Sequence, residues 1–362
     1  MYQNKNNLTF HNHACFSFRY GDYSCLVDPW FGDAIFNNSW RLLEEGSVFL
    51  EDLRFVFISH EHPDHLHWAT LKKIKESANS DITVCISKRD NPNLESKLLE
   101  LGFSVKVFEP FVESDVGGFK CCFYKEGSDN VIIFRLDDQV IVNQNDCYLS
   151  QQSSERLKLE YPSIDVWWMQ FSLAGYYGNK GDEEALTAAQ KFHKDTFKKY
   201  YNIFKPEIAI PFASFVYFSR DQNDYLNGYR VKLKDILNIV GESLQVLYKN
   251  DLVLPKLESQ ERTKYNIRKW EEQFEKSKPL DTIACNEGDF IKTSQDFFVN
   301  APDVQGSVPL EIYGSEKICV IDFTKKRAYF EEDYQGPPPI AKVTLPDLNY
   351  CLKFPWGADT LN

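Results

Sequence analysis

Alternating apolar and polar positions mark the first part of the chain as rich in strands. From Leu8 to Val27 apolar side chains recur at every second position around a Gly21-Asp22 turn, which predicts a β-hairpin. Phe55 to Ile58 is a run of aromatic and β-branched residues, typical of a buried strand. The chain then passes into Ser59-His-Glu-His-Pro-Asp-His-Leu-His, so this strand is expected to lead into a polar, histidine-rich loop.

Helices and strands are expected to alternate after this loop. The hydrophobic pattern predicts helices at 71–80, 91–101 and 183–201, and strands at 82–87, 103–108, 119–124, 131–136 and 139–147. Alternation of this kind implies β-α-β layering and therefore an α/β fold.

The character of the sequence changes near Val253. Residues 257–278 are strongly charged and helical by pattern, with Trp270 and Phe274 four positions apart on one face. From Phe290 onward short strands are expected, at 311–314, 318–323 and 327–330, followed by an amphipathic tail. We predict a main catalytic domain at 1–255, a connecting helix at 256–278 and a small C-terminal α+β appendage at 279–362. The appendage could be a pocket lid, a dimer contact or a substrate carrier.

The net charge of the chain limits the kinds of molecule that it is expected to bind. The 362 residues carry a formal net charge of −12, which argues against a nucleic-acid surface because phosphate binding relies on clustered Lys and Arg. An anionic small substrate remains possible, since a bound divalent cation can dominate the local field.

The number and distribution of the cysteines indicate a reducing cellular compartment. The nine cysteines are scattered and odd in number, which suits a reducing cytoplasm better than a disulfide scaffold. No apolar signal core follows Met1, and no window approaches a membrane-spanning run. We expect a soluble cytoplasmic protein with no membrane partner, and a homo-oligomer stays open.

The spacing of histidines after Ile58 indicates a metal site. His60 and His62 are two positions apart, so in an extended segment both imidazoles leave from the same side and can hold one cation. Asp64 and His65 follow a proline and can turn toward a second position nearby. The alternative is a solvated, histidine-rich turn, which is a less economical explanation in a chain with seven histidines.

The loop resembles the His-x-His-x-Asp-His signature of the metallo-β-lactamase fold, and the match is complete at His60, His62, Asp64 and His65. The resemblance implies a four-layer αββα sandwich that binds one or two divalent metal ions, with zinc, iron and manganese all open. It also implies that Asp28 orients the metal loop and that Asp146 bridges the metals. Each of these two could instead be a plain turn residue.

Two cation sites follow from this resemblance. One would be held by His60, His62 and Asp146, and another by Asp64, His65 and Asp146. Asp64 and His65 are also the candidate catalytic residues, with Asp64 as a base or as the residue that orients the attacking water.

The sequence departs from the usual dinuclear pattern, which has two further histidines. None lies between His67 and Asp146, where Asp129 or Glu126 could substitute as an oxygen donor and favour iron or manganese over zinc. His193, in the long helix, is expected on the surface or in packing, and His13 is assigned a structural role.

Later segments resemble the CMP-N-acetylneuraminate hydroxylase family and its bacterial relatives. The likeness is carried by 165–178, by the strand ending in Pro211-Phe212-Ala213, and by 345–359. Those hydroxylases carry a Rieske iron–sulfur segment, and the chain has no Cys-x-His and Cys-x-x-His pair to form one. An oxygenase reaction would therefore need a separate electron-transfer partner.

Several residues follow strands on the expected metal face and are candidate substrate contacts: Gln170, Tyr176, Tyr177, Phe212, Tyr217 and Arg220. Aromatic residues also dominate cores, so each of these could serve packing instead. Arg220 is the most distinctive, because its planar fork suits a carboxylate or phosphate.

Three functions compete at this point. The first is a metal-dependent hydrolase that uses activated water on an anionic sugar, lactone or phosphodiester. The second is an iron-dependent hydroxylase of a nucleotide sugar. The third is an inactive module that binds metal or sugar, which the two missing histidines would favour and the complete loop motif would not.

Overall fold

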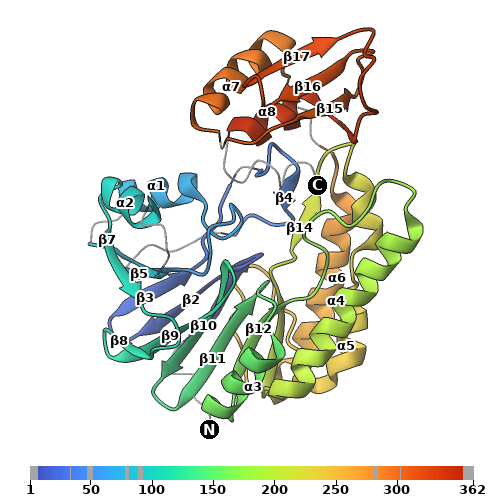
Figure 1. Cartoon of the computed structure of the whole chain (residues 1–362). Coiled ribbons are helices and arrows are strands. Elements are labelled where there is room, and N and C mark those ends of the chain that lie inside the picture. The colour runs from blue at the N-terminus through green and yellow to red at the C-terminus, as the bar shows by residue number, and fades with distance from the viewer. Residues whose placement is uncertain are drawn as a thin grey trace.

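Two six-stranded sheets pack face to face in the computed structural model, with helices outside both of them (Figure 1). The structure describes residues 7–32, 34–46, 52–77, 81–88, 93–279, 284–301 and 303–353. This arrangement confirms the predicted αββα sandwich with a small C-terminal α+β unit.

The first sheet comprises, in spatial order, β1 (Thr9–Asn12), β2 (Cys15–Tyr20), β3 (Tyr23–Val27), β5 (Leu53–Ile58), β6 (Thr83–Ser87) and β7 (Ser104–Phe108). Its last four strands run parallel, as crossover helices require. Two such helices, α1 (Trp68–Ser77) and α2 (Asn93–Glu100), cover the outer face, where Leu71 and Leu98 pack against Val56 and Val84.

The second sheet comprises, in spatial order, β13 (Ile208–Phe212), β12 (Val166–Gln170), β11 (Gln139–Asn145), β10 (Asp129–Leu136), β9 (Phe119–Glu126) and β8 (Ser114–Val116). Its outer side is covered by α3 (Gln151–Glu160), α4 (Glu183–Phe204) and α5 (Leu233–Val240) (Figure 1). Aromatic rings fill the space between the sheets, where Phe16 stacks on Trp168 at 4.6 Å and Phe57 meets Phe134 edge-on at 4.9 Å.

Helix α6 (Gln260–Lys276), predicted as a connecting helix, packs into the core of the main body. Trp270 is fully buried, 4.4 Å from the ring of Phe215, and its indole donates a hydrogen bond to the carbonyl of Leu247 at 2.8 Å. The buried face of the helix consists of Thr263, Asn266, Ile267 and Trp270, and most of its charged residues are exposed, so the helix is amphipathic.

The C-terminal unit is a four-stranded sheet with two helices. Its strands, in spatial order, are β17 (Arg327–Glu331), β16 (Ile318–Asp322), β15 (Ser307–Ile312) and β18 (Ala341–Val343), and α7 (Glu287–Asn300) and α8 (Leu345–Lys353) pack on them. The expectation of strands from Phe290 onward is wrong for α7. Asn286 caps that helix by accepting from the amide of Asp289, and Phe290, Ser294 and Phe298 recur on its buried face.

A short pair, β4 (Trp40–Leu42) with β14 (Val216–Phe218), lies between the sandwich and the C-terminal unit (Figure 1). Within the described ranges no helix is both long and apolar enough to span a bilayer.

Candidate metal centre

The histidine-rich loop begins at the carboxyl end of β5, and contacts with the carboxylate of Asp28 fix its position. Asp28 is fully buried at the end of the neighbouring strand β3, and its carboxylate accepts from the amide and the hydroxyl of Ser59, both at 2.7 Å. The same carboxylate lies 3.0 Å from Nδ1 of His65. This bond fixes the orientation of the His65 ring and leaves Nε2 facing the centre.

One group of potential ligands joins the loop to the second sheet. His60, His62 and Asp129 bring their ligand atoms within 4.8 Å of one another. Asp129 begins β10, and the next residue, Asn130, donates to the carbonyl of Ser59 at 2.8 Å, which ties this strand to the loop. Of the two oxygen donors considered in the sequence, Asp129 lies in this group, whereas Glu126 accepts from the amide of Ser150 at the start of α3.

A second group contains His13, which the sequence allowed at the border of the site but for which it favoured a structural role. His13 is fully buried in the turn between β1 and β2, and its Nε2 lies 3.0 Å from the carboxylate of Asp64. His65 Nε2 lies 3.3 Å from the same oxygen. The three residues form a compact set of two imidazoles and one carboxylate. The signal in the sequence was weak, because His13 stands far from the motif and the fold alone brings it there.

Asp146 lies between these two groups. Its Oδ2 is 3.6 Å from Nε2 of His60 and 3.5 Å from Nε2 of His65. The left-handed conformation of Asn145, with φ of 45°, turns the chain at the end of β11, and the Asn145 side chain accepts from the Asp146 amide at 2.7 Å. The carboxylate is thus aimed at both histidines.

Buried polar atoms without a partner show that these residues suit a metal. Among the described residues, Nε2 of His60, Nε2 of His65 and Oδ1 of Asp146 are buried and have no hydrogen-bond partner. Such atoms are costly unless something satisfies them. Burial, the largest effect, lowers the pKa of His60 to about 4, so its imidazole is neutral and offers a lone pair.

Two of the carboxyl groups, those of Asp146 and Asp64, have a lowered pKa, which favours the ionised form that a metal ligand needs. Burial opposes the charge on Asp146, but His60 and His65 outweigh it and hold the pKa of Asp146 below its usual range. Burial likewise opposes the charge on Asp64, and His65 and His13 hold the pKa of that carboxyl well below its usual range. Each of the two groups offers two imidazoles and one carboxylate, a donor set that suits a divalent cation, and Asp146 lies near one histidine of each group.

A hydrogen-bonded chain of aromatic residues lies beside Asp146. Tyr148 donates to Gln170 Oε1 at 2.6 Å and lies 3.1 Å from Nδ1 of His193, while Nε2 of His193 lies 2.9 Å from the Tyr177 hydroxyl. Gln170 ends β12, next to β11 and Asp146. His193, expected on the surface or in packing, is 1% exposed, and burial lowers its pKa to about 4.

The other candidate substrate residues have different surroundings. Phe212 lies in the core, 4.8 Å from the ring of Trp168, and Tyr217 is buried in the β4–β14 pair. Tyr176 is half exposed and donates to Asn179 at 3.0 Å.

Arg220 links the main body to the C-terminal unit through buried polar contacts. It is 1% exposed, pairs with Asp347 on α8 and donates to Thr344 at 3.2 Å. Asn37 donates to the same Asp347 carboxylate at 2.9 Å. The segment 354–359, part of the C-terminal likeness seen in the sequence, lies outside the described residues.

The αββα layers and the histidine–aspartate cluster at one edge define a metal-binding protein of the metallo-β-lactamase fold. Residues 7–157 match the model of the beta-lactamase superfamily domain. A possible metal-dependent hydrolase from Veillonella parvula has the same fold, with a TM-score of 0.51 and 12% identity over 68% of this chain and 98% of that one.

The chain is also similar in sequence to a named group of enzymes. It is 27% identical over 269 residues to the cytidine monophosphate-N-acetylneuraminic acid hydroxylase of Gorilla gorilla gorilla, which covers 66% of this chain and 43% of that protein. The Sus scrofa enzyme is 26% identical over 264 residues, covering 65% of this chain and 58% of that protein. The chain thus spans about half the length of these curated relatives.

Proposed function

We propose that the protein is a hydrolase that uses a pair of divalent cations to act on a small anionic substrate. The observation that carries this proposal is the position of Asp146 between two ligand groups, with its side chain 19% exposed. His62 and Asp129 are also partly exposed, so a substrate can reach the same edge of the cluster. An anionic sugar, a lactone or a phosphodiester would satisfy these requirements.

The residues divide the work as follows. His60, His62 and Asp129 would hold one cation, His13, Asp64 and His65 the other, and Asp146 both. Bound divalent cations supply a deprotonated water near neutral pH and polarise the substrate oxygen.

Asp64 and His65 act in this scheme as ligands. Asp64 is 5% exposed and within 3.3 Å of two histidines, so it is poorly placed to accept a proton from a substrate. Tyr148 donates its one hydroxyl proton to Gln170 at 2.6 Å, so its oxygen is placed to accept a hydrogen bond from a substrate hydroxyl.

A second candidate function is an iron-dependent hydroxylase that receives electrons from another protein. Asp129 favours it, because a carboxylate in place of an imidazole makes that site better suited to iron or manganese than to zinc. The names of the sequence relatives point the same way. We further infer a cytoplasmic location, which the nine free cysteines support.

The test is a comparison of reconstituted samples. Protein stripped with a chelator is reloaded separately with zinc, manganese or ferrous iron, then assayed against lactones and phosphodiesters without reductant. The same samples are assayed for oxygen consumption with a nucleotide sugar and a reductant. Asp146→Asn is the control, since it keeps the shape of the side chain and removes the shared charge.

Each outcome assigns a function. Hydrolysis that depends on metal and on Asp146 supports the hydrolase, and oxygen consumption with iron alone supports the hydroxylase. If every loaded sample equals Asp146→Asn in both assays, the protein is a binding module and both proposals are wrong.

A further inference from the structure

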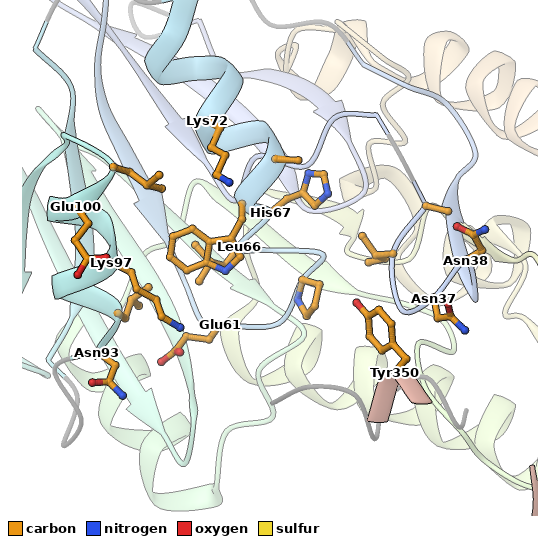
Figure 2. Close-up of a pocket in the computed structure, with 17 residues that line it drawn as sticks. Asn37, Asn38, Glu61, Leu66, His67, Lys72, Asn93, Lys97, Glu100 and Tyr350 are labelled. Atoms are coloured by element: carbon orange, nitrogen blue, oxygen red, sulfur yellow. The ribbon is translucent and has the colours of Figure 1, made fainter. Parts of the chain in front are cut away.

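A cavity of about 890 Å³ adjoins the metal loop on the side of α1 and α2. Glu61 and Pro63, which alternate with the metal ligands of the loop, form part of its wall, so the cavity and the metal centre share one segment of chain. The volume is in the range that holds a small organic ligand. Figure 2 shows α1 and α2 on one side of this space and Tyr350, from α8, on the other.

The faces of α1 and α2 that line the cavity each combine an apolar side chain with a positively charged one. On α1, Trp68 and Lys72 are four positions apart and therefore share a face. On α2, Leu94 and Lys97 are three apart and share a face in the same way. Each helix thus offers the cavity one large apolar side chain and one ammonium group.

The two ammonium groups are available to a ligand. Lys72 and Lys97 are exposed, and within the described ranges neither forms an ion pair or a hydrogen bond. Glu61 and Glu100 also border the cavity, and Figure 2 shows Glu100 at its outer edge. A ligand with an acidic group near the two lysines would find partners for that group.

The C-terminal unit completes the cavity. Tyr350 lies on α8, and α8 is held to the main body by the buried contacts of Asp347 with Arg220 and Asn37. Asn37 itself lines the cavity opposite α2. The polar cluster that attaches the C-terminal unit therefore also sets the position of the aromatic wall.

We propose that this cavity binds a small organic anion with an apolar ring, and that the C-terminal unit supplies part of the site. The acid group lies against Lys72 and Lys97, and the ring lies between Leu66, Trp68 and Tyr350. The ligand is the non-reacting part of the substrate. The inference rests on the proposed metal-dependent reaction for its purpose but not for its geometry.

Binding is tested on metal-free protein with anilinonaphthalene sulfonate, a fluorescent anion with an apolar ring body. Saturable binding of one probe per chain is expected. The double variant Lys72→Glu with Lys97→Glu should weaken binding by roughly tenfold or more, because two favourable charges become repulsive. Tyr350→Ser should weaken it by a few fold through loss of the ring contact.

Lys73→Glu is the matched control, since Lys73 is exposed on the same helix but does not line the cavity. Its affinity should stay within about twofold of the parent. Equal affinity of the double variant and this control would overturn the proposal, as would binding that does not saturate.

The result is separable from the proposed function. Metal content is measured on the same variants and should be unchanged. Should the double variant bind the probe normally yet the parent hydrolyse a substrate, the cavity is unrelated to the reaction and only this inference fails.

Discussion

His13 completes one of the two ligand groups, although it lies on the first hairpin rather than in the loop motif. Replacing it with Ala should lower the bound metal from about two cations to about one per chain, because Asp64 and His65 alone leave that group short of a ligand. The measurement is elemental analysis.

The control for that prediction lies two residues away. His11 is on β1, just before the turn that holds His13, but its Nε2 lies 2.8 Å from the hydroxyl of Ser17 and it belongs to neither ligand group. His11→Gln should keep both cations. A full metal complement in His13→Ala would show that His13 is structural after all.

In the proposed centre, we expect Asp129 to set the metal preference of the other ligand group. Asp129→His replaces an oxygen donor with an imidazole, so it should raise the ratio of zinc to iron retained from a mixed solution. Glu126→Gln is the matched control, since Glu126 accepts from Ser150 and should affect only the start of α3. The account is contradicted if both variants retain the parent's ratio.

His193 makes stability depend on pH. Its pKa of about 4 in the folded chain lies below its ordinary 6.5, so between these values the unfolded chain binds a proton that the folded chain does not. Stability therefore falls as pH falls through this window, by at most roughly 3 kcal/mol for this group. His193→Gln should flatten that slope in urea unfolding measured at pH 7 and pH 5. Parallel slopes in parent and variant would argue against it.

At the scale of elements, α8 depends on one buried charge pair. Asp347→Leu leaves the guanidinium of Arg220 buried without its partner, which should lower the free energy of unfolding by about 3 to 5 kcal/mol. Adding Arg220→Met should restore most of the loss, since no charge then remains buried.

Glu311→Gln is the control for this pair. It removes the carboxylate of an ion pair with Lys342 whose side chains are about half exposed, so it should cost less than about 1 kcal/mol. Urea unfolding compares the three variants with the parent. A loss in Asp347→Leu no larger than that in the control would mean that the pair does not hold α8.

Most elements were predictable because their hydrophobic patterns are local. The run from Phe55 to Ile58 and the loop after it required no information beyond neighbouring residues. Helix α7 was missed because Phe290, Phe297 and Phe298 favour strands by composition, while the cap at Asn286 and the spacing of four decide for a helix.

Spacing alone indicated the candidate ligands that are adjacent in sequence, whereas the resemblance to the fold supplied Asp146 and, as one of two alternatives, Asp129. The spacing of the loop residues was enough to indicate a metal site at His60, His62, Asp64 and His65. His13 and Asp129 are separated from them by whole strands, and only the packing of the two sheets brings all of them to one edge. Arg220 was a candidate substrate contact because its guanidinium suits a carboxylate or phosphate. In the structure, the carboxylate that it pairs with is that of Asp347.

At the scale of the whole molecule, the sandwich, the ligand groups at its edge and the C-terminal unit each contribute to the proposed site. The sheets hold the two ligand groups, while Tyr350 of α8 lies across a cavity from α1 and α2, and Glu61 and Pro63 of the metal loop form part of the cavity wall (Figure 2). Because the chain has a net charge of −12, we expect the proposed cations and the cavity lysines to provide the local positive charge that attracts the proposed acidic substrate.

The most direct test of the central claim is the metal content of the chain purified without chelator and without added metal, then offered zinc, manganese and ferrous iron in turn. The account predicts about two divalent cations per chain at saturation and a marked loss in Asp146→Asn. Protein that takes up no cation, or that takes up the same amount in Asp146→Asn, would contradict the dinuclear centre.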